Sequence, residues 1–310
     1  MKERRRSWQV PKREATPEEW LLTRRRFMET VAVGSLLAVA APAQRALAGA
    51  VSTGRATAPT GQRTDFGLDR ALTDERTAAT CSPYVELTPD RDAARFTETH
   101  APVPCRIEIG GLVKRPLVLD HDALHRLAPI EERVYRLRCV EGWAAVVPWL
   151  GVPLAAVVEA ARPLDSARFV RFESHPPVAP QAGGGHLRPP SPYSEGLTLA
   201  EATNELAFLA TGIYGHDLPL HHGAPLRLVV PWKYAHKSIK AVTRIEFTAT
   251  QPATFWNSIA PDEYPFHGNV DPHTPHPRWS QRREKMLGTG EVRETLPFNG
   301  YAEWVANLYV

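Results

Sequence analysis

The sequence predicts an α+β fold. Short β-prone runs and short helical segments follow one another without the regular strand–helix alternation of a parallel sheet. The 310 residues include 29 prolines, and proline disfavours long helices because it lacks a backbone N–H and clashes with the preceding turn. A composition of 43% hydrophobic and 23% charged residues is that of a globular protein rather than a disordered one.

Local patterns predict the elements of this fold in order. Strands are expected where β-prone residues run between turn-forming residues, such as Gly110-Gly111 at the end of the first. They cover residues 105–109, 116–119, 133–139, 167–172, 226–231 and 241–248. Asp120 caps a helix through Leu127, and Pro153 begins a second helix at 154–161. A third helix is expected at 199–211, ending at Gly212. The residues after 248 show little periodicity.

Residues 1–48 have the organisation of a twin-arginine signal peptide. Arg24-Arg25-Arg26-Phe27 precedes an apolar run from Val31 to Ala41, and Ala46-Leu47-Ala48 is a small-x-small cleavage site. The apolar run has about 11 residues, whereas a membrane-spanning helix needs about 20. The pattern predicts export by the twin-arginine translocase to the periplasm. That route carries folded proteins, which favours a cofactor inserted before export. A general secretory signal that contains arginines by chance is the alternative.

The basic charge is concentrated in this leader. The whole chain has a net charge of +3, but residues 49–310 hold 27 Lys and Arg against 29 Asp and Glu, a net of −2. We therefore expect no nucleic-acid binding. Residues 49–78 are rich in Thr, Ala, Gly and Arg and are expected to form a linker or an extended arm. Residues 79–310 are expected to form the globular domain.

Cys139 is the first candidate for chemistry. It follows a β-prone run that contains Arg136 and Arg138, and neighbouring arginines favour the thiolate that a nucleophile or a metal ligand requires. Inert packing is the alternative for a lone cysteine. Cys81 and Cys105 are expected to pack in the core or to pair as a disulfide. With three cysteines and no CxxC motif, a four-thiolate zinc or iron–sulfur site is excluded.

Two further groups could bind ligands. His267, His273 and His276 lie close together in a proline-rich stretch, but no HExxH motif supports a zinc site. Arg227 and three lysines, Lys233, Lys237 and Lys240, could hold an anionic, phosphate-bearing group. A solvated basic loop is the alternative. No GxGxxG or GxxxxGK[ST] motif is present, so a nucleotide site is not expected.

Five stretches resemble the sulfite oxidase superfamily. Within it, the resemblance is closest to the catalytic subunits of the bacterial periplasmic protein-methionine-sulfoxide reductases, and it extends over nearly the whole chain from Arg24. The stretches are Tyr135-Arg-Leu-Arg-Cys-Val-Glu-Gly-Trp143 with its continuation to Leu154, Pro231–Lys240, Ala260–Tyr264, His276–Gln281 and Phe298–Glu303.

This resemblance implies a sulfite oxidase-type molybdopterin-binding fold over residues 79–310, with one molybdenum–molybdopterin per chain. Cys139 would be the metal ligand, because a soft thiolate suits this metal. Cofactor-binding positions carried over from the family are Ser82, Val85, Glu86, Ser174, His222, Arg227, Ser238, Ile239 and Lys240. The chain departs from the family where Ser82 and His222 replace Asn, Ser174 replaces Thr and Ser238 replaces Gly. These departures bear on substrate preference and rate.

The resemblance further implies that the enzyme reduces methionine sulfoxide, free or in oxidised periplasmic proteins, to methionine. Glu141 and Trp143 would shape the pocket, and Glu141 could relay protons. The electron donor would be a haem-bearing membrane subunit, in keeping with the lack of a CxxCH motif here. No second β-sandwich domain is expected, which favours a monomer. Oxidation of sulfite or another small sulfur or nitrogen oxide is one alternative. A cofactor-bound protein without turnover is the other.

Overall fold

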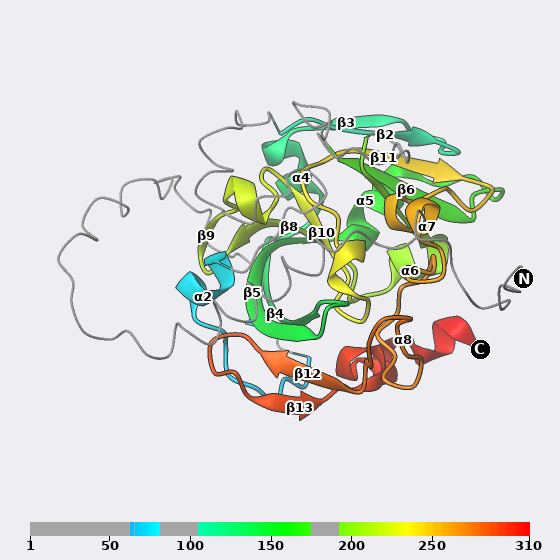
Figure 1. Ribbon diagram of the computed structural model, residues 1–310. Helices are drawn as coiled ribbons and strands as arrows, with labels where there is room; N and C mark the ends of the chain where they lie inside the picture. The colour runs from blue at the N-terminus through cyan, green and yellow to red at the C-terminus, as the bar shows by residue number, and fades with distance from the viewer. Residues whose placement is uncertain (1–62, 65, 81–104, 175–191) are drawn as a thin grey trace, which may run out of the picture. The chain divides into compact units, whose positions relative to one another are not determined.

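The computed structural model describes residues 63–64, 66–80, 105–174 and 192–310. Their strands form one sheet of eight strands and one of five, with short helices beside them (Figure 1). This arrangement confirms the predicted α+β class. The first 62 residues, including the predicted signal peptide, lie outside the described residues.

The eight-stranded sheet is organised around the antiparallel hairpin of β4 and β5. The first residues of β5 also pair with β12, whereas its last residues pair with β8. β5 therefore joins two groups of strands. The bounds in this sheet are β1 Arg63–Thr64, β4 Glu131–Arg138, β5 Trp143–Pro153, β8 Phe208–Ile213, β9 His216–Asp217, β10 Arg227–Val229, β12 Arg283–Met286 and β13 Val292–Glu294.

The five-stranded sheet has the order β3-β2-β11-β6-β7. Its central strand, β11, pairs parallel with β2 and antiparallel with β6. The bounds are β2 Ile107–Gly111, β3 Leu117–Leu119, β6 Phe169–Ser174, β7 Ser194–Thr198 and β11 Val242–Thr248.

The helices are short, as the proline content predicts. Asp120 caps α4, since its carboxylate accepts a hydrogen bond from the Ala123 N–H at 2.7 Å. The α-helices are α2 Glu75–Thr80, α4 His121–Leu127, α5 Leu154–Ala161, α6 Leu199–Thr203, α7 Phe255–Ile259 and α8 Ala302–Val305. The 3-10 helices are η2 Leu220–His222, η3 Ala235–Lys237, η4 Pro297–Gly300 and η5 Ala306–Tyr309.

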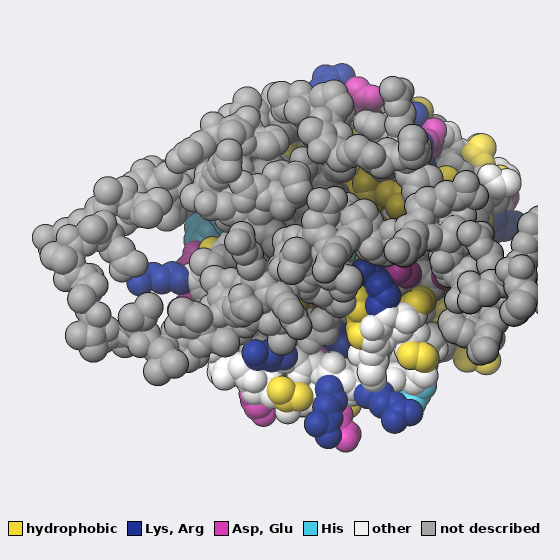
Figure 2. Space-filling model, viewed as in Figure 1, with side chains coloured by type: hydrophobic (Ala, Val, Ile, Leu, Met, Phe, Trp, Pro, Cys, Tyr) yellow, Lys and Arg dark blue, Asp and Glu magenta, His cyan; other side chains and the backbone are white. Residues whose placement is uncertain are grey.

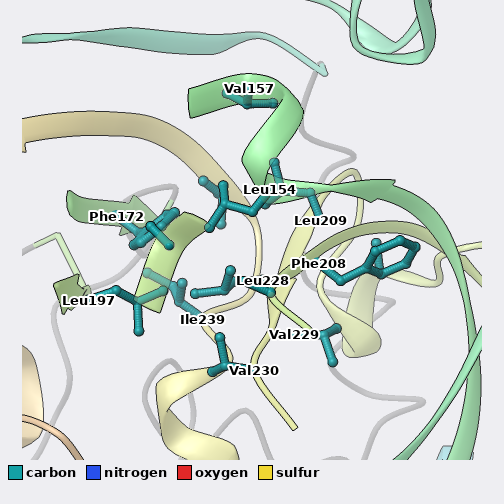
Figure 3. Packing of buried hydrophobic residues seen from close by; sticks show 14 of the residues in the cluster. Leu154, Val157, Phe172, Leu197, Phe208, Leu209, Leu228, Val229, Val230 and Ile239 are labelled. Atoms are coloured by element: carbon teal, nitrogen blue, oxygen red, sulfur yellow. The ribbon is translucent and has the colours of Figure 1, made fainter. Parts of the chain in front are cut away.

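One hydrophobic core is shared by both sheets and α5. Figure 3 shows Leu154 and Val157 of α5 beside Phe172 of β6 and Leu209 of β8. All four side chains are completely buried. Each contributes about 1.5–3 kcal/mol relative to an exposed side chain, so this core holds both sheets in the arrangement that shapes the site.

The predicted helix over 199–211 is wrong. The helix α6 stops at Thr203, and residues 208–213 form the strand β8 instead. The helix begins at Leu199 as expected, and the structure shows a capping box of Thr198 and Glu201 at its start. β8 is buried at every position and pairs with both β5 and β10. A continuous apolar run of this kind is compatible with a helix or a buried strand, and the pairing partners decide between them.

The strand β5 is the longest element that local patterns missed. Pro148 and Gly151 interrupt its apolar pattern, and both residues argue against a strand interior. At Gly151 the neighbouring strand passes so close that an added Cβ would lie 2.0 Å from the Leu209 carbonyl oxygen. Glycine is therefore required for the contact between β5 and β8.

The described residues before 81 contact the domain. The Thr73 N–H donates to the Val146 carbonyl at 3.0 Å, and its hydroxyl accepts from the Val146 N–H at 2.9 Å. The Tyr214 hydroxyl donates to the Thr73 carbonyl at 2.7 Å. This part of the predicted arm therefore lies against the eight-stranded sheet. The predicted boundary at residue 48 lies outside the described residues.

On the face in Figure 2, Lys, Arg, Asp and Glu side chains are interspersed over the described surface. Within the described ranges, we find no helix with the length and apolar character needed to cross a bilayer.

Candidate functional site

A single cavity of about 150 Å³ brings together every described residue that the sequence assigned to the site. Its lining includes Cys139, Glu141, Trp143, Ser174, His222, Arg227, Ser238, Ile239 and Lys240. These residues come from segments that are far apart in the chain. Ser82, Val85 and Glu86 lie outside the described residues, so their assignment stays a prediction.

Cys139 sits in the tight turn between β4 and β5. The Cys139 N–H donates to the Trp143 carbonyl at 2.9 Å, and the Gly142 N–H donates to the Cys139 carbonyl at 3.0 Å. Gly142 has a φ of +97°, a conformation that favours glycine. The hairpin thus places the thiol at the end of two paired strands, half-buried against Val140 and Tyr264.

The arginines beside Cys139 do not line the cavity. Arg138 is completely buried, where it pairs with Glu284 and donates to the Gln281 side-chain oxygen at 2.9 Å. Its guanidinium also donates to the Cys139 carbonyl. Arg136 pairs with Asp69 at 2.7 Å. Ion pairs therefore hold both arginines in place. The charge of Arg138 still interacts with Cys139, so the expected effect of these arginines on the thiol stays a prediction.

Arg227 is fixed at the cavity wall by backbone oxygens. Its guanidinium donates to the carbonyls of His222 at 3.0 Å and Ser238 at 3.1 Å, and it lies 4.7 Å from the centre of the Trp149 ring. The Ser238 hydroxyl accepts from the Val230 N–H at 3.1 Å. In this bond the Ser238 hydroxyl oxygen is the acceptor, so the hydroxyl can still donate its proton in a hydrogen bond to another group.

Lys240 reaches the same wall from a neighbouring loop. Its ammonium donates to the His221 carbonyl at 3.1 Å. Gly223 allows this contact, since its φ is +102° and an added Cβ would lie 2.7 Å from the Lys240 Cβ. Among the described lining residues, Arg227 and Lys240 are therefore the arginine and the lysine, and Ser238 adds a hydroxyl to the same wall.

His222 is a neutral member of this wall. Burial lowers the pKa of His222 well below its usual value, and the neighbouring His221 and Lys240 lower it further. A neutral imidazole has one donor and one acceptor nitrogen, so His222 can replace the hydrogen bonds of an asparagine without adding charge.

Two of the three lysines proposed for an anion site have another role. Lys233 pairs with Glu201 and Lys237 pairs with Glu195, each with 2.6 Å between nitrogen and oxygen. All four side chains are buried. A buried lysine needs such a partner because an isolated charge there is costly. Lys233 and Lys237 are therefore partners in buried ion pairs and do not line the cavity.

Aromatic side chains form another part of the wall, which sequence reasoning did not assign. Tyr264, Trp256 and His236 line the cavity. The Trp256 and Tyr264 rings stack with centroids 4.8 Å apart, and His236 meets Tyr264 edge-on at 5.1 Å. Burial raises the pKa of Tyr264 above its usual value, and Glu263 raises it further. Tyr264 ends one of the stretches that resemble the family, and Trp256 has no local signal.

Two of the three histidines considered for zinc are used in other contacts. His276 stacks on Trp279 at 3.7 Å and pairs with Glu263, and His267 contacts Glu201. The described ranges contain no cluster of three or more His, Cys, Asp or Glu side chains arranged for a metal ion. Cys105 is a free thiol, and burial raises its pKa to about 11. Cys81 lies outside the described residues.

The chemistry of the lining fits a molybdenum–molybdopterin. Cys139 supplies one soft sulfur donor, which suits this metal. Arg227, Lys240 and Ser238 supply charged and neutral donors that suit a phosphate group. The thiol therefore suits the metal of the implied cofactor, and the other three side chains suit its phosphate.

A family model and two relatives agree with this chemistry. Residues 98–256 match the oxidoreductase molybdopterin binding domain. The chain is 41% identical over 309 residues to the protein-methionine-sulfoxide reductase catalytic subunit MsrP of Burkholderia mallei, with 97% of this chain and 93% of that protein covered. Identity to the subunit of the same name from Ralstonia nicotianae is 40% over 310 residues, with the same coverage. A solved structure of the sulfane dehydrogenase SoxCD from Paracoccus pantotrophus matches at 19% identity and a TM-score of 0.39, covering 61% of this chain and 44% of that one.

Proposed function

Because the chain belongs to the family of protein-methionine-sulfoxide reductase catalytic subunits, which bind molybdopterin, we propose that it reduces methionine sulfoxide to methionine in the periplasm. Its substrates would be oxidised periplasmic proteins or the free amino acid. Family membership confirms the resemblance inferred from the motifs. The observation that carries the proposed function is the meeting of Cys139 with Arg227, Ser238 and Lys240 in one cavity.

The chain's own residues would bind and orient the reacting groups. Cys139 would ligate the metal, while Arg227, Lys240 and Ser238 would hold the phosphate of the pterin. One molybdenum–molybdopterin per chain would supply the two-electron, oxygen-transfer chemistry. The net reaction consumes one sulfoxide, two electrons and two protons, and it produces one thioether and one water. Glu141 is exposed and lines the cavity, so it is placed to exchange protons with solvent.

The electrons are proposed to come from a haem-bearing membrane subunit. No CxxCH motif for covalent haem attachment occurs in the sequence, so an external donor is compatible with this chain. The twin-arginine pattern at Arg24-Arg25 supports export through the twin-arginine translocase and a periplasmic location.

The position of Arg138 favours sulfoxide reduction over sulfite oxidation. A dianionic substrate needs several cations beside the metal. Arg138 is buried against Glu284 and does not line the cavity. Arg227 and Lys240 are the arginine and lysine of the described lining, and both are assigned to the cofactor phosphate.

The test combines metal analysis with two assays on the purified holoenzyme. We expect one molybdenum per chain and reduction of methionine sulfoxide with a reduced dye as the electron donor. Sulfite should not be oxidised at a comparable rate. A protein that holds no molybdenum, or that acts on sulfite alone, would contradict the proposal.

A further inference from the structure

Tyr264 is held rigidly beside Cys139. Its ring lies against Trp256 and His236, and Cys139 packs on the cluster that contains it. The backbone is fixed as well, because the Tyr264 N–H donates to the Ala260 carbonyl at 3.0 Å and its carbonyl accepts from the Asn257 amide at 2.9 Å. The side chain is 8% exposed. Tyr264 therefore has one well-defined position at the cavity wall.

The Tyr264 hydroxyl is available to a ligand. Within the described part of the chain, it makes no hydrogen bond, although it belongs to a cavity-lining residue. The other cavity-lining tyrosine differs, because the Tyr193 hydroxyl donates to the His236 carbonyl at 3.0 Å and lies 3.3 Å from Glu195. A phenol keeps its proton at neutral pH, so the Tyr264 hydroxyl is a hydrogen-bond donor there.

The polar atoms of the residues around the Tyr264 ring are covered by protein. The Trp256 indole nitrogen and the His236 Nδ1 atom are buried and have no hydrogen-bond partner among the described residues. Both residues line the cavity and contact the Tyr264 ring. Buried polar atoms are almost always hydrogen-bonded in proteins. The described residues leave these two nitrogens unpaired and cover them, so the Tyr264 hydroxyl is the group of this cluster that is placed to contact a ligand in the cavity.

We propose that Tyr264 donates a hydrogen bond to the sulfoxide oxygen of the substrate, and that the Trp256 ring packs against the substrate's sulfur and methyl group. The inference rests on the proposed function and names the substrate-binding residues for it. A sulfoxide oxygen is a strong hydrogen-bond acceptor. The thioether product has no such oxygen. Sulfur also packs favourably against aromatic rings. Tyr264 would thus distinguish substrate from product, whereas Trp256 would contact both.

The experiment measures binding by the oxidised holoenzyme, without an electron donor, so that no turnover occurs. Dissociation constants for methionine sulfoxide and for methionine are determined by titration calorimetry. For Tyr264→Phe, we expect methionine sulfoxide to bind about tenfold more weakly, as for the loss of one hydrogen bond. The dissociation constant for methionine should change less than twofold. In steady-state assays, the KM for methionine sulfoxide should rise.

Tyr234→Phe is the matched control. Tyr234 belongs to the same aromatic cluster, with its ring 6.4 Å from His236, but it does not line the cavity, and its hydroxyl bonds to the Asp271 backbone. Removing this hydroxyl should leave the dissociation constants for methionine sulfoxide and for methionine unchanged. Trp256→Phe is a second variant, which keeps an aromatic ring and removes the indole N–H. It should change the dissociation constants for methionine sulfoxide and for methionine by similar factors, because both ligands carry the sulfur and the methyl group on which the ring packs.

The outcomes separate this inference from the proposed function. Unchanged sulfoxide binding by Tyr264→Phe with normal molybdenum content would overturn the inference, as would equal weakening of sulfoxide and methionine. If the wild-type holoenzyme neither binds nor reduces methionine sulfoxide, the proposed function itself fails. If the wild type is active but Tyr264→Phe has the same ratio of dissociation constants for methionine sulfoxide and methionine as the wild type, the proposed function stands and the role of Tyr264 is refuted.

Discussion

Arg138 and Glu284 form a completely buried ion pair, with 3.2 Å between the arginine Nε and the carboxylate. The pair connects the strand that precedes Cys139 to β12, which lies about 145 residues later in the chain. Arg70 also contacts Glu284. Because the Arg138 guanidinium donates to the Cys139 carbonyl, this ion pair supports the turn that holds the thiol. Arg138 is a positioning residue for the site.

Removing Glu284 should therefore destabilise the fold strongly. Glu284→Ala leaves the Arg138 charge buried without its partner, a change that costs about 3–5 kcal/mol in proteins. Urea denaturation of the purified holoenzyme measures the free energy of unfolding. Glu291→Ala is the control, because Glu291 pairs with Arg293 on the exposed β13 and should leave the midpoint unchanged. Equal midpoints for Glu284→Ala and the wild type would show that the pair does not support the fold.

Cys139→Ser should abolish sulfoxide reduction while the protein still folds. The serine hydroxyl is a harder and less readily ionised ligand than a thiolate, and the half-buried position tolerates the smaller atom. Circular dichroism measures folding, and a reduced-dye assay measures activity. Cys105→Ser serves as the control, since Cys105 does not line the cavity. Full activity of Cys139→Ser would refute the ligand role.

Arg227→Met should lower the molybdenum content of the purified protein. The substitution keeps much of the side-chain volume and removes the charge that is proposed to bind the pterin phosphate. Metal analysis measures the content, without reliance on activity. Arg244→Met is the matched control, because Arg244 is exposed on β11. If Arg227→Met holds as much molybdenum as the wild type, Arg227 does not bind the pterin phosphate.

Glu201 should make folding stability depend on pH in the acid range. Burial alone would raise its pKa, but hydrogen bonds from His267 and Lys233 and the charge of Lys233 outweigh burial and lower it. A lowered carboxyl pKa contributes stability that is complete above the unfolded value, 4.5, and is lost as the pH falls toward the folded value. Burial lowers the pKa of Lys233 to about 8, so this lysine is protonated throughout that acid range and does not contribute to the slope.

The measurement is the free energy of unfolding between pH 5 and pH 3, compared with that of Glu201→Gln. The wild type should lose stability over this interval, and the variant should lose less of it. Glu263→Gln, at a partly exposed pair with Arg278, controls for the general effect of a removed carboxylate. Parallel curves for the wild type and Glu201→Gln would contradict the assignment.

Much of the site could be predicted from stretches that resemble the family, because those stretches contain the site residues themselves. Cys139 and the segment from Ser238 to Lys240 lie in such stretches, and all of them line the cavity. The sequence did not show that Lys233 and Lys237 differ in role from Lys240. The three lysines are neighbours in the chain, but their different environments depend on Glu201 and Glu195, which belong to other elements.

Local residue patterns were sufficient for the elements whose ends carry their own signals. These include α5 after Pro153, α4 after Asp120 and the start of α6 at Thr198, because capping and proline geometry act over a few residues. Tertiary structure alone decided that residues 208–213 form a strand and that Arg138 pairs with Glu284 and does not line the cavity. It also placed Trp256 and Tyr264 beside Cys139. These outcomes depend on strand pairing and burial between segments that are distant in the chain. The free energy of such contacts cannot be read from any short stretch of sequence.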